Sequence, residues 1–217
     1  MTLTSPSRRH VLKWTGVATT LAIAGGVLPN FGISAALAAD LGEGDIGVLN
    51  YAYALEQLEA AFYTQVVKTP YAEITDVELA NLKKIRDHEV AHVAFLKKAL
   101  GKAGLGGLEV DFSAVDFTSR KSVLGTADVF ENLGVGAYNG AGKLIKNVDY
   151  LAAAGSIVSV EARHAATIAL LTRGFGRDAA GGKNVDFKGL DKALAPKVVL
   201  KAAGPFIATA FTANSLV

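Results

Sequence analysis

The sequence predicts an all-α protein whose main part is an antiparallel four-helix bundle. Four long segments repeat apolar side chains with the period of an α-helix, and most are joined by short links. No segment alternates apolar and polar residues for long enough to predict a strand. Long helices with short links are typical of antiparallel bundles.

The ends of the helices are marked in the sequence. Pro70 ends the first helix because proline cannot continue it, and Thr75 with Glu78 forms a capping box that begins the second. Gly101 and Gly174 are suited to end the second and fourth helices. We therefore expect helices over 45–67, 75–101, 119–146 and 149–173.

Two segments lie outside this pattern. A long connection, 104–118, joins the second helix to the third. After residue 175 the chain is rich in glycine and then apolar, and Pro196 and Pro205 interrupt any long helix. We expect the bundle over 39–175, with 176–217 packed on it as a strap that contains a short helix near 190–203.

The first 38 residues resemble a twin-arginine export signal. Ser7-Arg8-Arg9-His10-Val11-Leu12-Lys13 is followed by an apolar run and by Ala36-Leu37-Ala38, a small-x-small cleavage site. The alternative is a membrane anchor, but the run is short and rich in glycine and threonine. We expect the twin-arginine machinery to export the folded chain to the periplasm or the outside, with 1–38 cleaved and no permanent membrane span. Export in the folded state favours a cofactor inserted beforehand.

Composition excludes several classes of site. The chain has no cysteine, which removes disulfides, thiolate metal sites and cysteine nucleophiles. Removing 1–38 takes away three of the 22 basic residues and none of the 20 acidic ones, which changes the formal net charge from +2 to −1. The remaining basic residues form no stripe interleaved with aromatics, so we expect no nucleic-acid partner.

Acidic residues occur at inward-facing positions of the predicted helices. In the second helix, Glu89 lies near the centre of the apolar stripe, with His92 on its flank. The fourth helix repeats this E-x-x-H pattern with Glu161 and His164. The word HEVAH, 88–92, also matches the H-E-x-x-H motif of zinc peptidases, but His88 lies at the edge of the stripe. We expect His88 to be a boundary histidine or a hydrogen-bonding partner of a ligand.

The first and third helices each add an inward acid. LEQLEAAFY, 55–63, aligns with FENLGVGAY, 130–138, which places Glu56 over Glu131 and Tyr63 over Tyr138. The mature chain is thus a weak duplication: a helix with glutamate and a helix with E-x-x-H, twice. Ordinary packing, a hydrogen bond to a ligand and a redox role all remain open for the two tyrosines.

These acids predict a dinuclear metal site. Buried carboxylates need a cation, and the predicted inner faces offer no lysine or arginine. Glu56 and Glu131 would each bind one metal ion, Glu89 and Glu161 would bridge the two, and the two histidines would each add a nitrogen. Glu59 also faces inward, so the first helix has two candidate ligands; Glu56 is favoured because the repeat places Gly134 opposite Glu59. Oxygen-rich ligation with one imidazole per metal suits iron or manganese.

This ligand pattern resembles that of the ferritin-like carboxylate-bridged dimetal proteins. LEQLEAAFY and FENLGVGAY are similar to the branch that includes plant desiccation-related proteins and exported bacterial relatives. The resemblance covers about 45–175 and implies two iron ions, or iron and manganese, that react with dioxygen or peroxide.

Three functions stay open at this point. The first is a redox protein of oxidative or desiccation stress, with ferroxidase, peroxide-removing or oxygenase activity. The second is a non-catalytic exported stress or envelope protein that keeps the bundle. The third, more remote, is a zinc peptidase that uses HEVAH. We expect no organic cofactor, and a monomer or homodimer.

Overall fold

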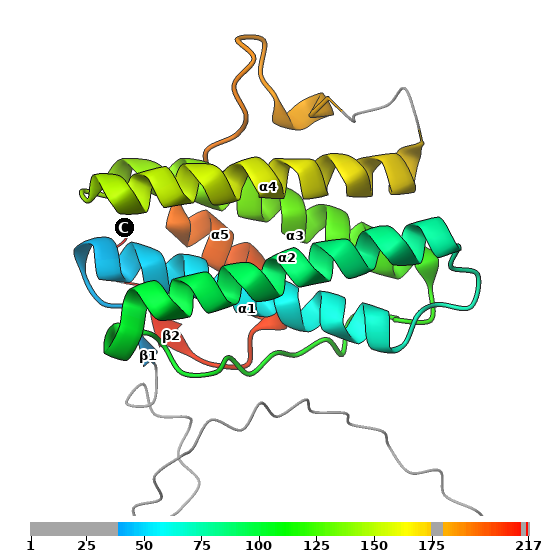
Figure 1. Cartoon of the computed structure of the whole chain (residues 1–217), viewed down its shortest axis with the longest axis horizontal. Helices are drawn as coiled ribbons and strands as arrows, with labels where there is room; N and C mark the ends of the chain where they lie inside the picture. Colours follow the sequence, from blue (N-terminus) through cyan, green and yellow to red (C-terminus); the bar gives the residue numbers. More distant parts are fainter. Residues whose placement is uncertain (1–38, 175–179, 214–215, 217) are drawn as a thin grey trace, which may run out of the picture.

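The computed structural model describes residues 39–174, 180–213 and 216 (Figure 1). Its helices are α1 (Gly44–Lys68), α2 (Asp76–Leu100), α3 (Arg120–Ala141), α4 (Val148–Arg173) and α5 (Pro196–Ala203). The predicted all-α bundle is confirmed. The predicted export signal, 1–38, lies outside the described residues. In the part of the chain that the structure describes, no helix is both long enough and apolar enough to cross a membrane.

The predicted ends of α1, α2 and α4 are found close to where the sequence places them. The Thr75 hydroxyl accepts a hydrogen bond from the backbone N–H of Glu78, and the Glu78 carboxylate accepts one from the backbone N–H of Thr75. Gly101 and Gly174 follow α2 and α4 with positive φ angles of 54° and 77°, a conformation that favours glycine.

The bundle consists of two antiparallel helix pairs. α1 packs mainly against α2, and α3 packs mainly against α4. The fully buried Phe62 of α1 contacts the rings of Phe130 on α3 and of Phe112 and Phe117 in the long connection. The connection between α2 and α3 therefore covers the bundle and closes one part of its core with aromatic rings.

Two expectations about the elements were wrong. α3 ends at Ala141 rather than residue 146 and continues as a 3₁₀ turn over Gly142–Leu144. The reason is that Asp45 accepts hydrogen bonds from the backbone N–H groups of Lys146 and Asn147, which holds this link outside a helix. Two short parallel strands also form, β1 (Ala39–Asp40) and β2 (Phe211–Thr212). Two residues are too few to show an alternating pattern.

The C-terminal extension is hydrogen-bonded to α3 and packs closely against it. The Leu194 backbone N–H donates to the Gly136 carbonyl at 2.8 Å, and the Leu194 side chain and backbone lie against Gly136 and Gly140. α5 then begins at Pro196, where proline is tolerated in the first turn, and buries Val199 and Ala203. The short helix predicted near 190–203 is therefore present over the second half of that range.

We predict that Gly140→Ala destabilises the protein by roughly 1–3 kcal/mol. A Cβ at Gly140 would lie 1.8 Å from the Leu194 carbonyl oxygen, so the extension would have to leave α3. Gly125, on the same helix, is the control, because a Cβ there meets nothing within 4 Å. Gly125→Ala should leave the melting temperature unchanged or raise it, because alanine is the better helix former. Equal melting temperatures for the two variants would contradict the close approach.

Candidate metal centre

The six predicted ligands converge in the middle of the bundle. The residues that offer ligand atoms come from all four long helices: Glu56 from α1, Glu89 and His92 from α2, Glu131 from α3, and Glu161 and His164 from α4. They form two groups of four, and within each group the ligand atoms lie within 4.8 Å of one another. One group contains Glu56 and His92, and the other contains Glu131 and His164. Glu89 and Glu161 belong to both groups, which is the arrangement expected of bridging carboxylates.

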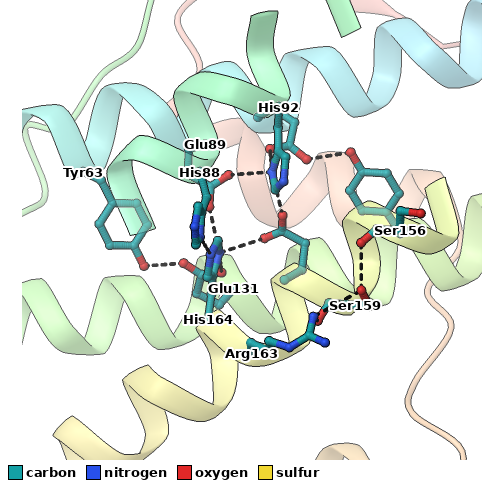
Figure 2. A network of polar contacts seen from close by, with 12 residues as sticks. Tyr63, His88, Glu89, His92, Glu131, Ser156, Ser159, Arg163 and His164 are labelled. Carbon is teal, nitrogen blue, oxygen red and sulfur yellow. Dashed lines mark hydrogen bonds and ion pairs between the residues drawn. The ribbon is translucent and has the colours of Figure 1, made fainter. Parts of the chain in front are cut away.

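The two histidines present the same ring nitrogen to the carboxylates. His92 Nδ1 lies 3.0 Å from Glu161 Oε1 and 3.1 Å from Glu56 Oε2. His164 Nδ1 lies 2.8 Å from Glu89 Oε1 and 3.4 Å from Glu131 Oε2. Figure 2 shows these contacts crossing the space between the helices.

Many of these buried atoms lack a hydrogen bond despite the short distances. Among the described residues, both carboxylate oxygens of Glu89 and of Glu161 have no hydrogen-bond partner, and neither does His164 Nδ1. The nearest atoms are close enough for ion pairing, but their angles do not suit hydrogen bonds. The oxygens and the nitrogen therefore face a shared space rather than one another, as ligands of a common ion would.

The electrostatics of the cluster also favour a cation. Burial, together with repulsion from Glu161 and Glu89, holds the pKa of Glu56 well above its ordinary value. Burial alone would lower the pKa of His92, but the surrounding carboxylates raise it to about 12. In the described ranges, the ion pairs of these glutamates are made with the two histidines alone. Two imidazoles cannot balance this many buried carboxylates, so metal ions fit the charge of the site.

The atoms that could bind a metal ion are of two kinds. Each group supplies carboxylate oxygens and one imidazole nitrogen, and no thiolate exists in the chain. Such a set of donor atoms differs from a structural zinc site, which is usually built from thiolates and imidazoles.

Comparison with known proteins identifies the family. A family model described as a ferritin-like domain matches residues 44–173, which span all four long helices. This chain belongs to the ferritin-like domain family. A comparison with curated proteins finds no match.

Each of the two tyrosines of this ferritin-like protein makes its hydrogen bond to a residue of the other repeat. Tyr138 donates a hydrogen bond to Glu56 Oε1 at 2.6 Å, and Tyr63 donates one to Glu131 Oε1. Each tyrosine thus contacts the glutamate of the other repeat rather than the one on its own helix. Of the roles left open by the sequence, two are observed: each tyrosine donates a hydrogen bond to a candidate ligand, and each ring also packs in the core.

His88 contacts the second half of the site rather than its neighbour on α2. Its Nδ1 lies 2.9 Å from His164 Nε2, and the two rings stack with an interplanar angle of 10° (Figure 2). Since His164 turns its Nδ1 to the carboxylates, His88 holds the opposite nitrogen and orients the ring. In the second repeat, the position equivalent to His88 is Val160, whose side chain cannot form a hydrogen bond. His92 therefore lacks a partner like the one that His88 provides to His164.

Glu59 is buried beside the site but belongs to neither group of ligand atoms. A Cβ placed on Gly134 would lie 3.3 Å from Glu59 Oε1, so the glycine leaves the room that this carboxylate occupies. Burial and the neighbouring glutamates hold the pKa of Glu59 well above its ordinary value. The geometry therefore favours Glu56 over Glu59 as the ligand from α1.

The sequence did not indicate which tyrosine donates a hydrogen bond to which glutamate, or that His88 stacks on His164. The helical phase of each residue gives the face it lies on, but a contact between two helices also depends on their rotation and relative height. The alignment of the two repeats was the one available signal, because it placed the tyrosines at equivalent positions.

We predict that Tyr63→Phe lowers the free energy of unfolding by roughly 1–3 kcal/mol, because it leaves a buried Glu131 oxygen without its donor. Tyr51 on the same helix is the control: it is also buried, but its hydroxyl has no hydrogen-bond partner among the described residues. Tyr51→Phe should therefore cost little or nothing. Denaturant unfolding of both variants measures the difference, and a larger loss for Tyr51→Phe would contradict the assignment.

Proposed function

We propose that this ferritin-like protein holds a dinuclear iron centre, or an iron–manganese centre, that reacts with dioxygen or peroxide. The observation that carries the proposal is the pair of four-residue groups that share Glu89 and Glu161. When bound, such a centre supplies electrons to the oxidant. The chain contributes the six ligands, the two tyrosines that fix Glu56 and Glu131, and a buried setting that excludes bulk water.

The twin-arginine-like sequence at Arg8 and Arg9 supports a further part of the proposal, namely export of the folded chain to the periplasm or the outside. A protein with a metal site enclosed by four helices gains from being loaded before export, because the site is complete only in the folded chain. A role in oxidative or desiccation stress would follow from removal of peroxide or of reactive ferrous iron outside the cytoplasm.

The geometry does not favour the zinc-peptidase alternative. A peptidase would need His88 and His92 to bind one ion together. His88 instead lies against His164, outside both groups of ligand atoms, and the glutamate of the motif belongs to both groups.

We predict that the double variant Glu89→Gln, Glu161→Gln loses metal, because both candidate bridges are replaced by neutral amides of the same shape. Metal analysis of protein purified through its own export route should show a fall of about tenfold or more. The near-ultraviolet absorption of a carboxylate-bridged diferric centre should disappear with it. Glu73→Gln, at an exposed position, is the matched control and should retain both. Unchanged metal content in the double variant would disprove the dimetal site.

We also predict that removal of metal lowers the melting temperature. An ion present at 100 times its dissociation constant stabilises the folded state by about 2.7 kcal/mol. For a chain of this length the corresponding shift is on the order of 5–10 °C. Thermal unfolding before and after chelation measures it, and the Gln double variant should not respond. A wild-type protein that melts at the same temperature in both states would not hold a metal in this cluster.

A further inference from the structure

His88 contacts the candidate metal centre without being one of its ligands. It is half-buried on α2 and belongs to neither group of ligand atoms. Its Nδ1 lies 2.9 Å from Nε2 of His164, and the two ring planes are parallel to within 10° (Figure 2). The equivalent position on α4 is Val160, which can neither donate nor accept a hydrogen bond. The contact therefore belongs to one half of the centre.

This contact determines the orientation of His164 when it binds a metal ion. His164 turns its Nδ1 to the carboxylates, at 2.8 Å from Glu89 Oε1, which leaves Nε2 for His88. A histidine that binds a metal ion through Nδ1 carries its proton on Nε2, so Nε2 donates and His88 Nδ1 accepts. Such a partner holds the ring in place and makes the metal-binding nitrogen more basic.

The half that contains Glu56 and His92 is held less firmly. Among the described residues, His92 forms its hydrogen bond through Nδ1, with Glu56, and its Nε2 has no partner. The His92 side chain is 11% exposed, whereas that of His164 is 4% exposed. A cavity of about 30 Å³, lined in part by Tyr138, also adjoins this half. An ion here would bind to a less fixed ring and would exchange with solvent more easily.

The ligands themselves are matched between the two halves. Each half has one imidazole and one glutamate of its own, and both halves share Glu89 and Glu161. The glutamate of each half accepts a hydrogen bond from a tyrosine. Glu59 adjoins the shared Glu161, since oxygens of both lie within 4 Å of the position that a Cβ on Gly134 would take. His88 is thus the polar contact that one half has and the other lacks.

We propose that His88 is a positioning residue that makes the two metal positions unequal. The ion held by Glu131 and His164 binds first and more tightly, and the ion held by Glu56 and His92 binds second and exchanges more readily. This inference rests on the proposed function, because it requires that the cluster hold two ions. Loss of a partner that orients a metal-binding histidine weakens binding by about 10–100-fold, so the two affinities should differ by a factor of this order.

The test is titration of the metal-free protein with Mn²⁺, followed by calorimetry and by electron paramagnetic resonance. At one equivalent we expect the signal of an isolated Mn²⁺ ion, and at two equivalents the signal of a magnetically coupled pair. His164→Ala should abolish the tighter step. His92→Ala should abolish the weaker step and retain the tighter one.

Two substitutions at His88 separate positioning from general packing. His88→Val should weaken the tighter step by about tenfold or more and leave the weaker step unchanged, which brings the two affinities together. His88→Asn is the matched control, because its side-chain oxygen can take the place of Nδ1 and accept the hydrogen bond from His164. It should restore most of the difference between the two steps. A role in packing alone would not be rescued by an amide.

Four results would overturn the inference: a coupled pair without isolated ions at one equivalent, loss of the tighter step in His92→Ala, equal weakening of both steps in His88→Val, or no rescue in His88→Asn. If His88→Val does not fold, the wild-type titration with His92→Ala and His164→Ala decides the order of binding. A protein that binds two Mn²⁺ ions with equal affinity would keep the dimetal site and refute the role of His88. A protein that binds no Mn²⁺ would refute the proposed function itself.

Discussion

Burial of carboxylates at the centre of the bundle is the constraint on which the rest of the structure depends. Glu56, Glu59, Glu89, Glu131 and Glu161 are all nearly inaccessible to solvent. An ionised carboxylate in such a place is strongly unfavourable unless it is paired. The structure places two histidines and two tyrosines around these acids, and the charge that remains is the charge that a pair of metal ions would neutralise.

The two halves of the site are alike in their ligands and different in their surroundings. Glu59 occupies space that Gly134 leaves free in the other repeat, and His88 stacks on His164 where the first half has no counterpart. Aromatic rings fill the core on the Tyr63 side, whereas a cavity adjoins Tyr138. Two ions held here would therefore be bound directly by the same kinds of residue. The polar residues around those ligands, and the access of small molecules, would differ between the two ions.

Much of this arrangement follows from local rules in the sequence. The helix ends at Thr75, Gly101 and Gly174 depend on residues within one turn, and the period of 3.6 places Glu89 and Glu161 inward. What could not be predicted depends on contacts between distant segments. The end of α3 is set by Asp45, about a hundred residues earlier, and the stacking of His88 on His164 depends on how α2 lies against α4. No local pattern encodes these distances.

The crossed hydrogen bonds of Tyr63 and Tyr138 have a consequence for how such a chain could have arisen. Each repeat supplies the donor that the other repeat's glutamate accepts, so one helix pair alone contains half of each contact. Two identical helix pairs related by a two-fold axis would form the same two bonds across their interface, because an isologous interface makes every contact twice. A single-copy ancestor could thus have assembled this centre as a symmetric dimer. Fusion of the two copies would then have freed each half to change separately, which fits the differences between Glu59 and Gly134 and between His88 and Val160.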